Sequence, residues 1–167
     1  MELAGVIAHS DRIGRIAYIA TSRADGRPHS APVGIAWIDD HVCAFVMNPS
    51  VKVANVRRDP RAHLHWQVGP ESNNDSLIID GLATVIDTTA GRAELWDHMG
   101  YDLAEFEPNG PESDGHVFIK VAPVRAAVLY RFGFDGRDDW VDEPVVAEAT
   151  IDLAQRPSGS VASPAKA

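Results

Sequence analysis

The sequence contains a single cysteine, Cys43, among its 167 residues. One cysteine excludes an internal disulfide and a cysteine zinc cage, a pattern typical of proteins from a reducing compartment. Long apolar runs are also missing: no stretch approaches the roughly 20 apolar residues that a membrane-spanning helix needs. The first residues include Glu2 and do not have the apolar centre of a signal peptide. We therefore expect a cytoplasmic protein with no membrane partner.

Positive charge is scarce as well. Lysine and arginine together number 15 against 24 aspartate and glutamate residues, which gives a formal net charge of −9. This balance argues against a general nucleic-acid binder, because such proteins need a basic surface to displace the counterions of phosphates. Any site for an anion must therefore be local. The content of 45% hydrophobic and 23% charged residues is that of an ordinary soluble globular domain.

The first third of the chain predicts three consecutive antiparallel strands. Residues 15–22, 29–38 and 41–47 are rich in β-branched and aromatic residues. Asp25-Gly26 and Asp39-Asp40 separate these runs, and both pairs tolerate the backbone conformations of tight hairpin turns. A short helix around residues 3–9 precedes the first strand.

The remainder mixes short helices with further strands. Val53 and Val56 are spaced as on a helix that begins near Ser50 and ends at Asp59-Pro60, because proline disfavours helical geometry in the residue before it. Residues 61–68 alternate as in a half-exposed strand, and 76–87 form a long strand with a bulge or bend at Gly81. A third helix is predicted from Thr88 or Thr89 to residue 99. An acidic loop at 101–115 then leads to a strand at 116–132, bent or broken at Pro123.

This order of elements predicts a mostly β fold, a six- to seven-stranded antiparallel barrel, closed or split, with two or three short helices. Barrel closure removes the exposed edges that such a meander would otherwise leave. We assign residues 1–132 to the barrel domain and 133–167 to a C-terminal extension. From about residue 155 the composition of proline, serine, alanine and glycine predicts disorder.

The positive charge that is present gathers in one place: Lys52, Arg57, Arg58 and Arg61 surround a single acid, Asp59. If Ser50 caps the helix, the N–H groups of the first turn and the positive end of the helix dipole lie beside Lys52 and form a site for an anion. Residues 31–33 and 45–47 of the adjoining strands offer an apolar floor for a flat ring. The alternative is that these cations are only the solvated face of a short surface helix.

The same segment carries a family resemblance. The run from residue 19 to residue 66 resembles the pyridoxamine 5'-phosphate oxidase-like split-barrel family of FMN and deazaflavin oxidoreductases. Its recurring pattern reads here as Asp25-Gly26-Arg27-Pro28, then Ser50-Val51-Lys52, then Asn55-Val56-Arg57-Arg58-Asp59-Pro60-Arg61 followed by Leu64. The likeness extends more loosely over residues 11–130, where "EFEPNGPESDGHVFIKVAPVRAAV" is similar to the general-stress-protein branch of the family.

The resemblance implies an antiparallel split β-barrel that binds FMN and transfers hydride to or from a small organic substrate. Lys52 and Ser50 would meet the cofactor phosphate. The ribityl chain and the ring would lie between two short stretches, Ala31, Pro32 and Val33 on one side and Val46, Met47 and Asn48 on the other. The resemblance also implies a homodimer with cofactor sites at its interface. It identifies no catalytic side chain, since the cofactor carries the hydride.

The sequence departs from the oxidase itself at three positions. The oxidase has arginines where this chain has Ala31 and Val51, and a threonine near Val46. Two phosphate-binding cations are therefore missing, and we do not expect oxidation of vitamin B6. The alternatives are a reductase that uses a deazaflavin coenzyme and a non-catalytic module that binds flavin or haem.

Five other residues and one loop have competing interpretations. His63 and His65 lie two apart, as metal ligands can, but no cysteine or acidic triad completes a site, and we expect no metal. Cys43 is predicted to be a buried structural thiol. Trp66 is predicted to pack in the core or at a dimer interface, and Trp140 either covers a partner's cofactor or docks the tail. The loop at 105–115 is either a lid or a solvated connection.

Overall fold

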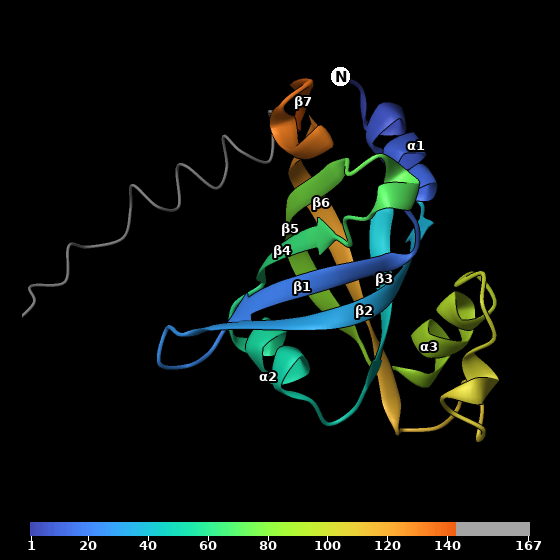
Figure 1. The fold of residues 1–167 in the computed structure, drawn as a ribbon. Helices are drawn as coiled ribbons and strands as arrows, with labels where there is room; N and C mark the ends of the chain where they lie inside the picture. The colour runs from blue at the N-terminus through green and yellow to red at the C-terminus, as the bar shows by residue number, and fades with distance from the viewer. Residues whose placement is uncertain (143–167) are drawn as a thin grey trace, which may run out of the picture.

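The computed structural model describes residues 1–142, which form seven strands and three α-helices (Figure 1). The helices are α1 (Leu3–Ile13), α2 (Val51–Arg58) and α3 (Thr89–Trp96). The strands are β1 (Ile16–Ser22), β2 (Pro28–Ile38), β3 (His41–Met47), β4 (Arg61–Trp66), β5 (Ser76–Ile86), β6 (His116–Tyr130) and β7 (Gly136–Val141). None of the helices in this part of the chain has the length and apolar character needed to cross a bilayer.

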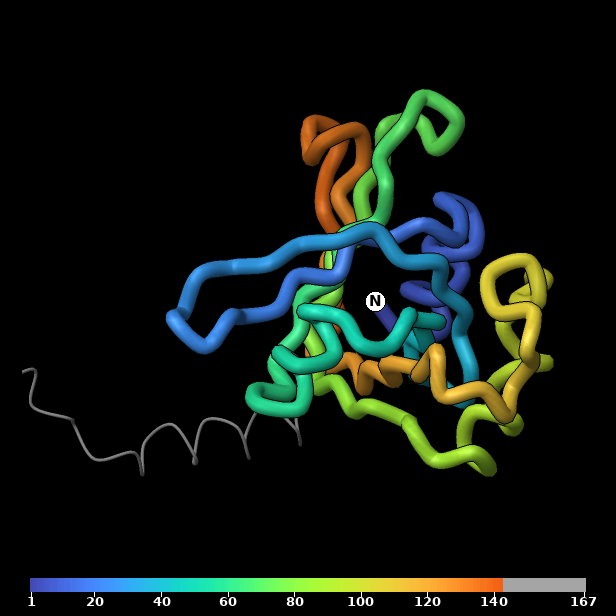
Figure 2. Tube along the Cα trace, turned by 90° about the horizontal axis from the view of Figure 1, so that it is seen from below, coloured from blue at the N-terminus to red at the C-terminus, as the bar shows by residue number. Residues whose placement is uncertain are grey.

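Six of the strands close into an antiparallel barrel. The strand order is β3-β2-β1-β4-β5-β6-β7, and the additional pairing of β3 with β6 closes the ring. β7 continues the sheet beyond the barrel by pairing with β6. The predicted mostly β antiparallel barrel with short helices is therefore confirmed. Figure 2 shows the ring from below, with α2 on one side and the segment 97–115, in yellow-green and yellow, on another.

The two predicted hairpin turns are confirmed. Gly26 has a φ of 82°, and Asp39 and Asp40 have φ values of 47° and 60°, the left-handed conformations that short hairpin connections need. They join β1 to β2 and β2 to β3, and the three strands pair antiparallel, as predicted.

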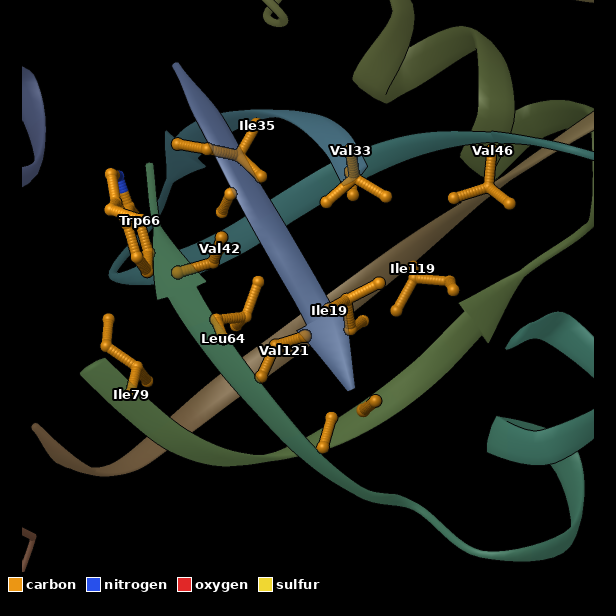
Figure 3. Packing of buried hydrophobic residues seen from close by; sticks show 14 of the residues in the cluster. Ile19, Val33, Ile35, Val42, Val46, Leu64, Trp66, Ile79, Ile119 and Val121 are labelled. Atoms are coloured by element: carbon orange, nitrogen blue, oxygen red, sulfur yellow. The ribbon is translucent and has the colours of Figure 1, made fainter. Parts of the chain in front are cut away.

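The barrel interior is filled by alternating strand residues, whose side chains point toward one another in Figure 3. Leu64 and Trp66 on β4 are fully buried, as the alternation of residues 61–68 predicted. Trp66 is thus a core residue. Cys43 is buried too, and burial raises the pKa of its thiol to about 11, so it remains a protonated structural side chain.

The predicted irregularity at Gly81 is present. The register between β5 and β6 shifts between Asp80 and Gly81. A Cβ atom at Gly81 would lie 2.5 Å from the carbonyl oxygen of Ala122, so this position requires glycine. Of the two alternatives predicted at Pro123, a bend or a break, the break is wrong: β6 runs without interruption through Pro123, and the register irregularity opposite Gly81 lies directly after it, at Val124.

α2 packs against β1, β2 and β5 through Val53 and Val56, the two valines whose spacing predicted the helix. α3 begins at the predicted cap, where the Thr88 hydroxyl accepts a hydrogen bond from the Gly91 N–H. β7 lies inside the predicted C-terminal extension, and its Trp140 packs half-buried against the barrel core. The disorder predicted from residue 155 lies outside the described residues.

Candidate functional site

A cavity of about 560 Å³ lies where β2 and β3 meet the segment 97–115, and we call it the β2–β3 cavity. Its volume is in the range of roughly 300–1,000 Å³ that is usual for sites of small ligands. It is lined by Arg15, Ile16, Pro32, Val33, Gly34, Phe45, Val46, Met47, Lys52, Tyr101 and Phe106. Most of these residues are apolar. The two cations are Arg15, which directly precedes β1, and Lys52 on α2.

Five of the eight residues predicted to bind a cofactor line this cavity: Pro32, Val33, Val46, Met47 and Lys52. Their contributions are unequal. Val33 and Val46 are only 6% and 2% exposed and point into the barrel in Figure 3, so they reach the cavity at their edges. Met47 is 48% exposed and offers most of its side chain. Ala31, Asn48 and Ser50 are not among the lining residues.

Lys52 is the central cation of the predicted anion site. It lies in the first turn of α2, half-buried, and burial lowers the pKa of its amine. Within residues 1–142, no carboxylate lies within 4 Å of the amine. An amine that is partly removed from water without an acid beside it is prepared for an anionic ligand.

Ser50 occupies the N-cap position of α2 but does not act as predicted. Its backbone is extended, yet its side chain makes no capping hydrogen bond. The hydroxyl oxygen is instead buried and has no partner within the described chain. Since buried hydroxyl groups nearly always have a hydrogen-bond partner, this orphan oxygen marks a place where a ligand would complete the structure.

His29 is a further polar residue close enough to Lys52 to feel its charge, although it is not among the lining residues, and sequence reasoning missed it. It lies on β2 two residues before Ala31, so both side chains face the same side of the strand. Its Nδ1 atom is buried without a partner. Burial lowers the pKa of His29, and the positive charges of Arg23 and Lys52 lower it further, which places all three side chains within electrostatic reach of one another. The signal in the sequence was a histidine, His29, two residues before Ala31 in a strand that is otherwise mostly apolar.

The other end of the cavity is formed by Arg15 and Tyr101. Arg15 donates a hydrogen bond to the carbonyl oxygen of Gly100, and the Tyr101 hydroxyl lies 3.4 Å from the carbonyl oxygen of Gly34. A Cβ atom at Gly34 would lie only 2.7 Å from the Tyr101 oxygen, so the missing side chain at Gly34 makes room for the phenol. Burial raises the pKa of Tyr101, which keeps its proton.

Aromatic side chains from the segment 97–115 cover the cavity. Phe106 is 57% exposed, and its ring centroid lies 6.4 Å from those of both Phe45 and Tyr101. This part of the predicted acidic loop is thus a wall of the cavity. The aromatic and leucine residues inside an otherwise acidic run were the signal that distinguishes a wall from a solvated connection.

Arg92 on α3 holds this wall in place. It is 3% exposed, and it donates hydrogen bonds to the carbonyl oxygens of Pro111 and Glu112 at 3.3 and 3.1 Å. Its guanidinium also pairs with Asp114 at 3.0 Å. The segment therefore has a defined position over the barrel.

His116 lies beneath the same wall, at the start of β6. It is fully buried, and neither ring nitrogen has a hydrogen-bond partner among the described residues. Its ring stacks on Phe45 with centroids 5.1 Å apart and lies 5.1 Å from Trp96. Burial, followed by the charge of Arg92, lowers the pKa of His116 against an opposing effect of Glu107, so the ring is neutral in its aromatic cage.

The two histidines weighed as metal ligands have separate partners. His63 contacts Asp80 at 2.7 Å and His65 contacts Ser76 at 2.7 Å. Residues 1–142 contain no group of three or more histidine, cysteine or acidic side chains that would hold a metal ion. His63 and Asp80, with Arg61, line a second cavity of about 510 Å³ beside the Gly81 bulge, which we call the β4–β5 cavity.

Comparison with known proteins gives both a family and relatives of similar fold. The model of the family described as "Pyridoxamine 5'-phosphate oxidase" matches residues 14–130. A search of curated proteins gives no match. A protein related to general stress protein 26, from Clostridium acetobutylicum, superposes with a TM-score of 0.70 at 12% identity, over 87% of this chain and 99% of the other.

Two further solved structures share the fold. A pyridoxamine 5'-phosphate oxidase-related, FMN-binding protein from Nostoc punctiforme has a TM-score of 0.57 at 17% identity, over 83% of this chain and 87% of its own. A protein named F420 reductase has a TM-score of 0.54 at 22% identity, over 70% of this chain and 93% of its own.

Proposed function

The chain belongs to the pyridoxamine 5'-phosphate oxidase family, and we propose that it is an FMN-dependent oxidoreductase that binds its cofactor in the β2–β3 cavity. The observation that carries this proposal is the Lys52 amine, which lines a mostly apolar cavity and has no acidic partner among residues 1–142. Two polar atoms without a hydrogen-bond partner, the Ser50 hydroxyl and His29 Nδ1, belong to residues just outside the cavity lining. These are the groups that a phosphate would satisfy.

The phosphate end supplies a large part of the binding energy. A hydrogen bond to a charged group contributes about 1.5–3 kcal/mol. Two or three such bonds from Lys52, Ser50 and His29 would therefore provide roughly half of the 8 kcal/mol that corresponds to micromolar affinity. His29 lies on the same face of β2 as Ala31 and could donate a neutral hydrogen bond to a phosphate, but its lowered pKa means that it does not replace the positive charge that Ala31 and Val51 lack.

The apolar walls hold the rest of the cofactor. Pro32 and Met47 present exposed surface from neighbouring strands, and Phe45 closes the space between the barrel and the segment 97–115. These side chains bind and orient a flat ring and keep water away from it. FMN, when bound, supplies the hydride-transfer chemistry, so the protein needs no nucleophilic side chain.

A deazaflavin coenzyme is the alternative cofactor. It is supported by the fold shared with the protein named F420 reductase and by the loss of two phosphate-binding arginines at Ala31 and Val51. The family resemblance implies that deazaflavin-binding relatives rely more on the lysine and on the helix with the sequence "NVRRDPR", and this chain keeps both, at Lys52 and at residues 55–61. The substrate in either case is a small organic molecule.

We also propose a homodimer with the cofactor sites at its interface. The outer surface of a barrel is usually polar, but here Ile16 and Tyr18 on β1 are large and exposed. Ile16 and Met47 form part of the cavity rim, so a partner that covers this face would also help to close the site. The reducing cytoplasm suits a protein whose only cysteine is a buried thiol.

Titration of the apo-protein with FMN, riboflavin and the deazaflavin coenzyme, followed by quenching of cofactor fluorescence, tests the proposal. We expect saturable FMN binding at least tenfold tighter than that of riboflavin, which lacks the phosphate. Tighter binding of the deazaflavin would select the alternative cofactor, and no saturable binding of either would overturn the proposal. A bound flavin that no nicotinamide or organic donor reduces would instead indicate a non-catalytic module.

A further inference from the structure

The β2–β3 cavity has a second positively charged end that the phosphate does not use. Arg15 lines the cavity and is exposed, and one of its N–H groups is bonded to the Gly100 carbonyl oxygen. Within the described part of the chain, no carboxylate pairs with it, although the protein is strongly acidic. Most of the other arginines in residues 1–142 have an acidic partner, among them Arg12, Arg57 and Arg61, whereas Arg23, Arg58 and Arg125 do not.

Arg15 and Lys52 enter the cavity from different elements. Arg15 precedes β1, whose Ile16 pairs with Gly34 on β2, whereas Lys52 lies in the first turn of α2. Most of the other residues that line the cavity are apolar, so a phosphate held by Lys52 would leave the guanidinium of Arg15 without an anion.

Tyr101 stands beside Arg15 at this second end. Its hydroxyl is 3.4 Å from the Gly34 carbonyl oxygen, which is long for an O–H···O hydrogen bond. The proton of this hydroxyl can therefore be turned toward a better acceptor at little cost. An arginine with free donors next to a tyrosine hydroxyl matches the two oxygens of a carboxylate, which arginine binds in a bidentate manner.

We propose that Arg15 and Tyr101 form a subsite for the carboxylate of the substrate, and that the substrate is a planar, unsaturated organic acid. The flat apolar body of such an acid would lie against Ile16 and beneath the Phe106 ring, next to the cofactor. This inference rests on the proposed function, because it assigns the phosphate end of the same cavity to the cofactor. Gly34 contributes by leaving room for the phenol of Tyr101.

The test is a titration of the FMN-loaded protein with benzoate, an aromatic carboxylate, followed by isothermal calorimetry and by the flavin difference spectrum. We expect saturable binding of benzoate and at least tenfold weaker binding of benzyl alcohol. Arg15→Gln should weaken benzoate binding about ten- to a hundredfold, as expected for loss of charge-assisted hydrogen bonds. Tyr101→Phe should weaken it by a smaller factor, about three- to tenfold.

Arg57→Gln is the matched control, since Arg57 is exposed and pairs with Asp87 away from the cavity. It should leave benzoate binding unchanged, and thermal unfolding should show that every variant is folded. Equal affinities for benzoate and benzyl alcohol would overturn the inference. So would an Arg15→Gln variant that loses as much FMN affinity as benzoate affinity, because the guanidinium would then hold the cofactor.

The experiment separates this inference from the proposed function. If the wild-type protein fails to bind FMN, the proposed function fails, and calorimetry of benzoate with the apo-protein still tests Arg15. If FMN binds and benzoate does not, the carboxylate subsite fails while the cofactor site stands.

Discussion

Replacement of Lys52 by methionine is the sharpest test of the phosphate end of the cavity. Methionine keeps the length and the apolar stem of the side chain and removes only the amine. The amine is half-buried, its pKa is lowered by burial, and no carboxylate of residues 1–142 neutralises it. The unliganded protein therefore gains nothing from the charge, and its free energy of unfolding should stay the same or rise.

The loss should appear in cofactor binding. A charged hydrogen bond contributes about 1.5–3 kcal/mol, so Lys52→Met should weaken FMN binding roughly ten- to a hundredfold. Riboflavin lacks the phosphate, and its affinity should change by less than a factor of two. The ratio of the two affinities, measured by fluorescence quenching, isolates the interaction with the phosphate from any general damage to the cavity.

Arg57→Ala provides the control on the same helix. Its guanidinium is 3.0 Å from Asp87 on the exposed side of α2 and does not line the cavity. Exposed pairs of this kind contribute about 0–1 kcal/mol to stability, and the change should not alter FMN binding. Equal losses of FMN and riboflavin affinity in Lys52→Met, or no loss of either, would refute the assignment of Lys52 to the phosphate.

Two further predictions concern the wall of the cavity. His116 has a folded-state pKa below its ordinary value of 6.5, so the unfolded chain takes up a proton first and the free energy of unfolding falls as the pH drops below about 6.5 through the folded pKa. In urea unfolding, the free energy of unfolding of His116→Leu should fall less between pH 7.5 and pH 5 than that of the wild type, since the remaining histidines contribute to both proteins alike. An identical pH dependence of the two proteins would disprove the role of the buried ring. Gly34→Ala should displace the Tyr101 phenol, because the new Cβ would lie 2.7 Å from its oxygen, and cost about 1–3 kcal/mol of stability. The same substitution in a Tyr101→Phe background should cost less, and strictly additive costs would show that the two side chains do not meet.

The local patterns of the sequence predicted most of the secondary structure. The alternation in residues 61–66 placed Leu64 and Trp66 inside the barrel, and the two aspartate-containing turns fixed the first three strands. These features depend on neighbouring residues alone. The predicted cap at Ser50 is wrong because its hydroxyl is buried without any hydrogen-bond partner in the described chain, and the burial of a side chain depends on tertiary packing that the local pattern does not record.

The site residues were predicted in part, and strand geometry explains why neighbouring predicted residues contribute unequally to the cavity. Side chains of adjacent strand residues point to opposite faces, so Pro32 and Val33 do not contribute equally: Pro32 is exposed, whereas Val33 is 6% exposed and belongs to the core. Arg15, Tyr101 and Phe106 were missed because they reach the cavity only through the closure of the barrel and the placement of the segment 97–115. Such long-range contacts leave little trace in local sequence patterns.

A crystal structure of the protein grown with FMN tests the central claim most directly. The account predicts that the phosphate lies within hydrogen-bond distance of the Lys52 amine and the Ser50 hydroxyl, with the ring between Pro32 and Met47. The guanidinium of Arg15 should remain free of the cofactor. Electron density for FMN in the β4–β5 cavity beside His63 and Asp80, or a β2–β3 cavity that stays empty at saturating FMN, would contradict the account.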